Sequence, residues 1–216
     1  MNKAPFISFE GSEGCGKSTQ IARLVEILEK QGREVLLTRE PGGTVVGERI
    51  RDLLQYTPEA VGMSSEAELL LFAASRAQLV REVIEPTLQQ GKWVIADRFM
   101  DSTTVYQGLG RGLDAQAVRS INEFAVGEVK PDLTFLLDMD AKQGHARAQA
   151  ASQAAGQFDR MEDQELDFFE RVRQGYLDLA KEEKERIVVI DAAKSIEEVS
   201  HCIQDVLKDR YHEFSA

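Results

Sequence analysis

The chain has 216 residues, of which 43% are hydrophobic, and its formal net charge at pH 7 is −11. This length suffices for one compact α/β core, so we expect a single domain over residues 1–216. The acidic excess argues against binding to nucleic acid or to an anionic membrane. No signal peptide or membrane-length apolar run is visible, and Cys15 and Cys202 lack metal spacing, which together predict a cytoplasmic protein with free thiols.

The first predicted strand is the apolar run Pro5–Phe9, and helical spacing of apolar residues begins after Ser18. The loop between them fits the pattern G-x-x-x-x-G-K-[ST] completely. Such a loop points successive backbone N–H groups at phosphate oxygens, while its lysine reaches the outer phosphates and its hydroxyl ligates Mg²⁺. We therefore expect ATP phosphates to contact Gly11, Ser12, Glu13, Gly14, Cys15, Gly16, Lys17, Ser18 and Thr19.

Four further strand-like runs follow, each after a helical stretch: Glu34–Thr38, Lys92–Asp97, Leu133–Asp138 and Arg186–Asp191. Five short apolar strands separated by helices predict a three-layer α/β/α domain with a five-stranded parallel sheet, of the P-loop NTPase type. Ligands of such sheets bind at the carboxyl ends of the strands. A last helix from Ser195 to about Tyr211 is predicted to bury one stripe of apolar residues, namely Ile196, Val199, Ile203, Val206 and Leu207.

The tract Ala146–Gln157 is rich in Ala and Gln and nearly devoid of large apolar residues. It can form a helix, but it has little to bury. Two interpretations stay open for it: a solvated helix end, or a mobile cover over the triphosphate, for which we take a lid over about 146–160.

Two classes of nucleotide-binding protein compete at this point. A switch GTPase needs a late Asn-Lys-x-Asp, and a transporter-type ATPase needs a helix-opening Ser-Gly-Gly; neither pattern occurs here. A phosphotransferase needs a second anion site that faces the phosphate loop. Arginines near the strand ends offer one, although each alone is more often a surface salt-bridge partner: Arg39, Arg51, Arg76 and Arg98.

Five motifs along the chain resemble the bacterial thymidylate kinase family. They are "FEGSEGCGKST", "TREPGG", "FAASRAQ", "DRFMDSTTVYQG" and "KPDL", and they run from the first strand toward the last helix. The resemblance implies transfer of a phosphoryl group from ATP to dTMP, with Mg²⁺, in a cytosolic homodimer on the route to dTTP for DNA synthesis. A broader pyrimidine monophosphate kinase and a regulatory ATPase without an acceptor are the alternatives.

Phosphoryl transfer depends on positioning and charge neutralisation, which suggests catalytic roles for a few side chains. Lys17 would act on the ATP phosphates, and Arg98 is suited to grip the acceptor phosphate bidentately. Asp97 either orients Mg²⁺-bound water together with Ser18 as a metal ligand, or is a buried partner of Arg98. The lid would supply Arg147 or Arg160 to the transferring phosphoryl group, unless these arginines only pair with nearby acids such as Asp159 and Glu162.

The resemblance also assigns residues to dTMP. Phe72 would stack on thymine, with a core aromatic as the alternative, and Arg76 lies four residues on, on the same helix face. Gln107 carries an amide that suits a pyrimidine edge. The remaining implied contacts with base, sugar and phosphate are Glu13, Glu40, Pro41, Arg51, Arg98, Thr103 and Tyr106, with Glu13 expected to face a sugar hydroxyl.

Overall fold

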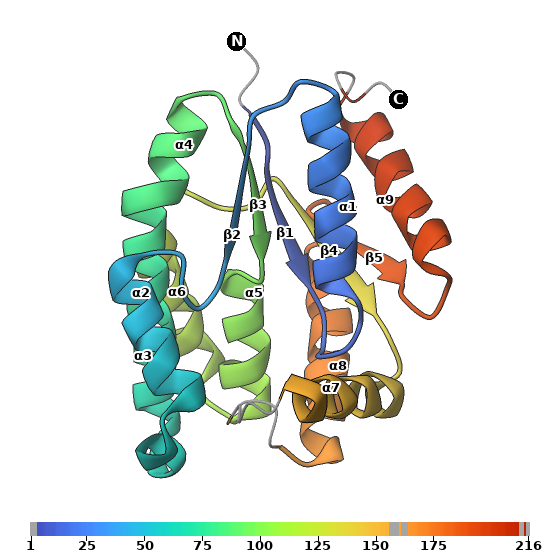
Figure 1. Cartoon of the computed structure of the whole chain (residues 1–216). Coiled ribbons are helices and arrows are strands. Elements are labelled where there is room, and N and C mark those ends of the chain that lie inside the picture. Colours follow the sequence, from blue (N-terminus) through green and yellow to red (C-terminus); the bar gives the residue numbers. More distant parts are fainter. Residues whose placement is uncertain (1–3, 156–159, 161–163, 212–213, 215–216) are drawn as a thin grey trace.

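The computed structural model describes all residues except 1–3, 156–159, 161–163, 212–213 and 215–216. Five parallel strands form one sheet in the order β2-β3-β1-β4-β5, covered by helices on both faces (Figure 1). The strands are β1 (Phe6–Glu10), β2 (Val35–Arg39), β3 (Trp93–Asp97), β4 (Leu133–Asp138) and β5 (Ile187–Asp191). The predicted three-layer α/β/α sheet is therefore confirmed, with bounds that differ by one residue or none.

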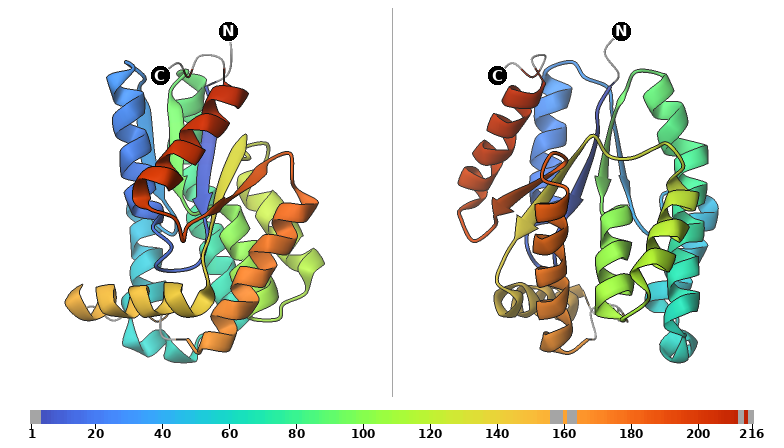
Figure 2. Two further views of the ribbon diagram at one scale, coloured as in Figure 1. Left: turned by 90° about the vertical axis from the view of Figure 1, so that its right-hand side faces the viewer. Right: turned by 180° about the vertical axis from the view of Figure 1, so that it is seen from behind.

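Alternation along the strands distributes side chains between two layers of core. Ile7 and Ile95 pack with α1 (Lys17–Lys30) and α9 (Ile196–Arg210) on one face. Their neighbours Phe6 and Val94 point to the other face. There they pack with the end of α3 (Ser65–Leu79) and the π-helical turn η3 (Val80–Ile84), while α8 (Leu166–Glu182) packs on β4 and β5 (Figure 2).

Apart from α6 and α7, the remaining helices have seven residues or fewer. Several of them are π-helical or 3₁₀ turns, which the periodicity of apolar residues in the sequence does not predict. Their bounds are α2 (Val45–Arg51), η1 (Asp52–Tyr56), η2 (Pro58–Gly62), α4 (Glu85–Gln89), α5 (Met100–Thr103), η4 (Thr104–Gly110), α6 (Ala115–Val126) and α7 (Ala141–Ala155).

The last helix begins at a capping box, in which the Ser195 hydroxyl accepts from the Glu198 backbone N–H and the Glu198 carboxylate accepts from Ser195. Val199, Ile203 and Leu207 are buried as predicted, and Val206 is partly buried. The prediction for Ile196 was wrong: this side chain is 49% exposed. It opens the first helical turn, and burial of the stripe begins only at Val199.

The tract predicted as a cover begins as helix. Helix α7 runs through Ala155, and Arg160 is described just beyond it, whereas residues 156–159 of the predicted lid lie outside the described residues. Within the part of the chain that the structure describes, no helix is long and apolar enough to cross a membrane. Cys15 and Cys202 are both free cysteines.

Candidate active site

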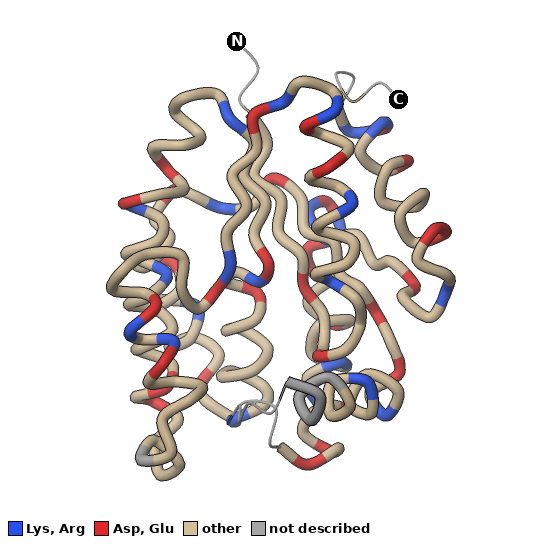
Figure 3. Tube along the Cα trace, viewed as in Figure 1, with Lys and Arg blue, Asp and Glu red and all other residues tan. Residues whose placement is uncertain are grey.

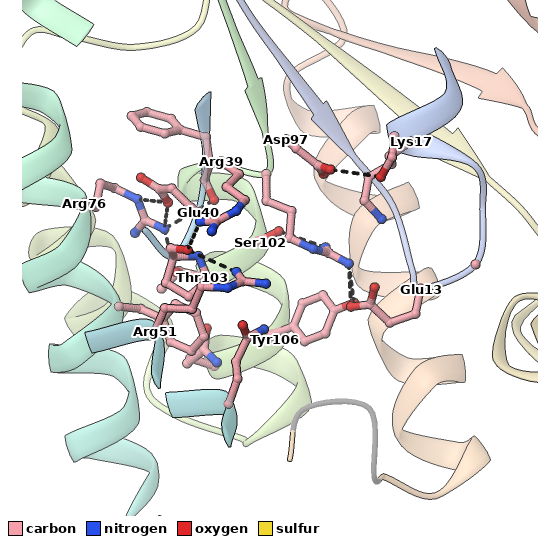
Figure 4. A pocket seen from close by; sticks show the side chains of 18 of the residues that line it. Glu13, Lys17, Arg39, Glu40, Arg51, Arg76, Asp97, Ser102, Thr103 and Tyr106 are labelled. Atoms are coloured by element: carbon pink, nitrogen blue, oxygen red, sulfur yellow. Dashed lines mark hydrogen bonds and ion pairs between the residues drawn. The ribbon is translucent and has the colours of Figure 1, made fainter. Parts of the chain in front are cut away.

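A cavity of about 450 Å³ opens at the carboxyl ends of the central strands (Figure 4). The phosphate loop forms one wall, and residues from β2, β3, α2, η1, α3, α5, η4 and α7, with the loops after β2 and β3, form the rest. Most of the residues that the sequence predicted for ATP, Mg²⁺ or dTMP line this one cavity: Glu13, Gly14, Gly16, Lys17, Ser18, Thr19, Glu40, Pro41, Arg51, Phe72, Arg76, Asp97, Arg98, Thr103, Tyr106, Gln107 and Arg147.

The phosphate loop is fixed from both ends. Gly16 precedes α1 with a φ of 94°, a conformation that glycine adopts without steric cost. The Lys17 ammonium donates to the carbonyl oxygens of Gly11 at 3.1 Å and Ser12 at 3.0 Å, so it lies over the loop that it follows. Gly14 leaves room for helix α7, because a Cβ there would collide with the carbonyl oxygen of Gly144.

Ser18 and Asp97 lie side by side at the base of the cavity. The Ser18 hydroxyl donates to the Asp97 carboxylate over 3.3 Å. A hydroxyl and a carboxylate are hard oxygen ligands of the kind that Mg²⁺ takes. Among the described residues no group of three His, Cys, Asp or Glu side chains forms a metal cage. A phosphate-loop Mg²⁺ needs none, because it is bound through few protein ligands plus phosphates and waters.

Arg98 is the most constrained cation in the cavity. Its backbone has a φ of 68°, which is unusual for a residue with a side chain. One terminal nitrogen donates to Glu13 at 2.6 Å and to the Tyr106 hydroxyl at 3.3 Å. The other donates to Ser102 at 3.1 Å and to the Tyr176 hydroxyl at 3.3 Å. Four partners thus hold the guanidinium plane in one orientation before any substrate binds.

Glu13 was expected to face a sugar hydroxyl, and it pairs with Arg98 through its oxygen Oε1. Burial alone would raise the pKa of Glu13, but the charges of Arg98 and Lys17 and hydrogen bonds from Arg98 and Tyr106 outweigh it and lower the pKa to about 2. Its second oxygen, Oε2, accepts no hydrogen bond from the described residues. One carboxylate oxygen is therefore left for a ligand.

Glu10, at the end of β1, supports Arg98 from below, a role that sequence reasoning missed. It is fully buried and accepts hydrogen bonds from the Ser102 hydroxyl at 2.6 Å, the Tyr176 hydroxyl at 2.8 Å and the Phe99 backbone N–H at 2.8 Å. Burial, reinforced by the charge of Asp101, raises the pKa of Glu10. The only sequence signal was the place of Glu10 at a strand end.

Arg76 and Glu40 form a buried pair, and their side chains are 1% and 3% exposed. Glu40 uses Oε2 for both contacts with Arg76, and its buried Oε1 has no hydrogen-bond partner among the described residues. Burial raises the pKa of Glu40 to about 7 although the charge of Arg76 lowers it. Arg76 also donates to the Thr103 hydroxyl at 3.0 Å (Figure 4) and to Asn122 at 2.7 Å.

Further residues complete the wall opposite the phosphate loop. Phe72 is half-buried, so its ring belongs both to the cavity lining and to the edge of a core cluster. Arg51 donates to the Pro41 carbonyl oxygen at 3.0 Å and to the Tyr56 hydroxyl at 3.1 Å. Gln107 is buried and donates its side-chain nitrogen to Glu68 at 2.8 Å.

Four predicted residues lie outside the lining: Gly11, Ser12, Cys15 and Arg160. The first two accept from Lys17 through their carbonyl oxygens, and Cys15 is 3% exposed beneath the loop. Arg160 lies instead against Glu68 at 2.7 Å. The prediction did not include three residues that do line the cavity, namely Gln55, Phe99 and Ser102, and it named Arg39, which also lines it, only as one of the cations near the strand ends.

The cavity has a charge opposite to that of the chain. Six Lys or Arg side chains and three Asp or Glu side chains line it, although the whole molecule carries −11. Elsewhere, positive and negative residues are interspersed along the helices (Figure 3). A cavity lined mainly by cations attracts anionic ligands although the molecule as a whole is negative.

A phosphate loop at the end of β1, facing a second cation-lined wall across one cavity in a parallel sheet, defines a P-loop phosphotransferase that acts on a nucleotide. A family model described as thymidylate kinase matches residues 9–203. The chain belongs to the thymidylate kinase family.

Relatives and a solved structure agree over most of the chain. A thymidylate kinase of Syntrophotalea carbinolica is 50% identical over 200 residues, which covers 92% of each chain. One from Kosmotoga olearia is 50% identical over 194 residues and 90% of each chain. The crystal structure of the thymidylate kinase from Ehrlichia chaffeensis superposes with a TM-score of 0.74 at 38% identity, covering 94% of this chain and 98% of that one.

Proposed function

We propose that this protein transfers the γ-phosphoryl group of ATP to dTMP to give dTDP and ADP, as one step of dTTP supply for DNA replication. The observation that supports this most directly is the single cavity in which Lys17 and Ser18 face Arg98, Arg76 and Gln107. In the reaction a phosphate oxygen of dTMP attacks the γ-phosphorus, and the bond to the β,γ-bridging oxygen of ATP breaks.

On the donor side, the backbone N–H groups of Gly14 to Thr19 surround the ATP phosphates, and Lys17 leaves its loop carbonyls to contact them. Ser18 would ligate Mg²⁺, and Asp97 would orient its bound water. Mg²⁺ would neutralise charge on the β- and γ-phosphates. Asp97 accepts from Ser18 and makes no hydrogen bond to Arg98 among the described residues, which favours the metal interpretation of Asp97 over that of a partner of Arg98.

On the acceptor side, Arg98 and Arg51 bind the dTMP phosphate, and the fixed guanidinium of Arg98 supports this role. Glu13, through its available Oε2, and Glu40 with Tyr106 hold the deoxyribose and crowd a 2′-hydroxyl. Thymine stacks on Phe72. Its edge is read by Arg76, Thr103 and Gln107, and Pro41 contributes contact at the rim of the cavity.

The lid at about 146–160 closes over ATP as part of the single domain 1–216. Arg147 lines the cavity and approaches the phosphate loop at Gly14, which supports its contact with the transferring phosphoryl group. For Arg160 the neighbouring Glu68 suggests a different position in the state described here.

We further propose a cytoplasmic homodimer, with no nucleic-acid or membrane partner. Large apolar side chains are exposed on three neighbouring helices: Val46 of α2, Leu70 of α3 and Phe124 of α6, the last at 88%. An exposed apolar surface of this kind is typical of a protein–protein contact.

The test is ATP consumption with Mg²⁺ and dTMP, dUMP, dCMP or AMP as acceptor, each beside a control without acceptor. We expect kcat/KM for dTMP to exceed those for dCMP and AMP by at least about tenfold, and Lys17→Ala to abolish turnover. Equal consumption without an acceptor would identify a regulatory ATPase instead. Comparable rates with dTMP and dCMP would identify a broader pyrimidine monophosphate kinase.

A further inference from the structure

A second cluster of buried charges lies beside the cavity, centred on Glu68 of α3. The side chain of Glu68 is 2% exposed, yet no sequence motif marked it. Its oxygen Oε1 accepts from Gln107 at 2.8 Å and from Arg111 at 3.1 Å. Its oxygen Oε2 accepts from Arg160 at 2.7 Å and from Arg111 at 3.3 Å. One carboxylate thus connects α3, η4 and the residue beyond the lid helix.

The partners of Glu68 keep it ionised. Burial alone would raise the pKa of Glu68, but the hydrogen bond from Gln107 and the two guanidinium groups of Arg111 and Arg160 lower it. An ionised carboxylate only accepts hydrogen bonds. The side chain of Gln107 must therefore turn its NH₂ group toward Glu68, and its carbonyl oxygen Oε1 away from it.

That carbonyl oxygen makes no hydrogen bond to the described residues, and Gln107 lines the cavity. The cavity wall therefore offers an acceptor at Gln107, and the same wall carries the N–H donors of Arg76. Thymine and uracil present a complementary edge, with a carbonyl oxygen beside an N3–H donor. Cytosine presents an amino group and an unprotonated N3. The N–H donors of Arg76 would then face the amino donor of cytosine, and the Gln107 oxygen would face the N3 acceptor.

We propose that Glu68 is a positioning residue for base selection: by fixing the amide of Gln107 it makes the cavity accept a pyrimidine with an N3–H and reject one without. The inference rests on the proposed function and deepens it. The energetic basis is asymmetric, because a buried polar group left unpaired by the wrong base is penalised more strongly than a correct pair is rewarded.

The experiment measures kcat/KM for dTMP, dUMP and dCMP in the wild type, in Glu68→Gln and in Glu66→Gln. An amide at position 68 donates as well as accepts, so Gln107 becomes free to turn over. We expect the dTMP-to-dCMP ratio of kcat/KM to fall by about tenfold or more in Glu68→Gln. The dTMP-to-dUMP ratio should stay within about twofold, since both bases carry N3–H, and so should KM for ATP.

Glu66→Gln is the matched control, because Glu66 is exposed on the first turn of the same helix and the substitution removes the same charge. The control should keep every wild-type ratio. A structural role alone would lower kcat/KM for all three acceptors in parallel, and this outcome, or an unchanged dTMP-to-dCMP ratio in folded Glu68→Gln, would overturn the inference.

Loss of two ion pairs can also prevent folding, so a second variant exchanges the pair as Glu68→Gln with Gln107→Glu. It keeps one acid and one amide and again turns acceptor oxygens toward the cavity. Binding of dTMP and dCMP without ATP, measured by calorimetry, should retain the wild-type preference for dTMP, and loss of that preference would contradict the inference. Absence of dTMP turnover by the wild type would refute the proposed function itself, which separates the two failures.

Discussion

At the scale of single residues, the site is organised around an arginine whose orientation is fixed before substrate arrives. Ser102 and Tyr176 both donate to Glu10, so their oxygens are left to accept from Arg98. Because the guanidinium already has one orientation, less conformational entropy is lost when a phosphate binds to it. Glu13 completes the arrangement, because its carboxylate neutralises the charge of Arg98 as long as no phosphate is bound.

The same pairing predicts how stability depends on pH. The pKa of Glu13 is about 2 in the folded protein, against an ordinary value of 4.5 for a glutamate carboxyl in the unfolded chain. Because the folded pKa is the lower one, the stabilisation is fully present above pH 4.5 and is lost as pH falls toward 2. It amounts to about 3 kcal/mol at most, since the side chain of Glu13 is 22% exposed.

The measurement is the free energy of unfolding by urea at pH 6, 4.5 and 3, in the wild type and in Glu13→Gln. The wild type should lose more stability than the variant between pH 4.5 and 3, because only the wild type takes up the proton of Glu13 on unfolding. Parallel pH curves for the two proteins would show that the low pKa of Glu13 is wrong.

At the scale of elements, the strands followed from the sequence and the short helices did not. The strands β1, β3 and β4 are buried on both faces and are therefore continuous apolar runs. The edge strands β2 and β5 are partly exposed, but their Val, Leu and Ile residues still mark them, so all five strands were found to within a residue. The turns η1, η3 and η4 follow or precede ordinary helices without a change in periodicity, so nothing local marks them. Tertiary contacts decide them.

The residues of the candidate site also divide into those that the sequence predicted and those that it missed. Motif residues such as Lys17, Arg98 and Gln107 were predicted and do line the cavity. Glu68 and Tyr176 were missed because their roles come from contacts between residues far apart in the chain, which no spacing encodes. Ile196 failed for the opposite reason: its spacing was right, but the first turn of α9 extends beyond the core.

Helix α7 and the segment beyond it give the second prediction, because the structure separates two arginines that the sequence treated together. Arg147 lines the cavity, whereas Arg160 contacts Glu68 and donates to the Leu54 carbonyl oxygen at 2.9 Å. We expect Arg147→Ala to lower kcat at saturating ATP and dTMP by ~10³, as for an arginine that stabilises the transferring phosphoryl group. Arg160→Ala should instead lower the melting temperature and raise KM for dTMP.

Lys142→Ala serves as the control, since Lys142 is an exposed cation on the same helix. It should leave kcat and KM unchanged. If the double variant of Arg147 and Arg160 keeps kcat within about tenfold of the wild type, a barrier change of ~1.4 kcal/mol, the lid does not supply a catalytic arginine.

At the scale of the whole molecule, the two edges of the sheet differ in what they expose. Helices α2, α3 and α6 lie together beyond β2 and β3, and α9 lies beside β5 at the other edge (Figure 1). The first edge carries Leu70 at 56% and Phe124 at 88% exposure. Since Arg76 of α3 and Asn122 of α6 bond each other at 2.7 Å within the base-reading wall, a contact on these helices would also steady the acceptor site.

The last prediction follows from this asymmetry. In a two-fold symmetric dimer formed by α2, α3 and α6, Phe124 is buried twice, and full burial of each ring contributes about 2–3 kcal/mol. We therefore expect Phe124→Glu to weaken dimerisation by a hundredfold or more and to give monomers at micromolar concentration in light scattering. Ile196→Glu is the matched control, because Ile196 is a large apolar residue, 49% exposed, on α9 at the other edge. A wild-type protein that is monomeric would contradict the proposed dimer, and a dimer that Ile196→Glu disrupts while Phe124→Glu leaves it intact would place the interface elsewhere. If the dimer also supports the acceptor wall through Arg76 and Asn122, the Phe124→Glu monomer should show a raised KM for dTMP with KM for ATP unchanged, because the phosphate loop lies on the far side of the cavity from α3 and α6.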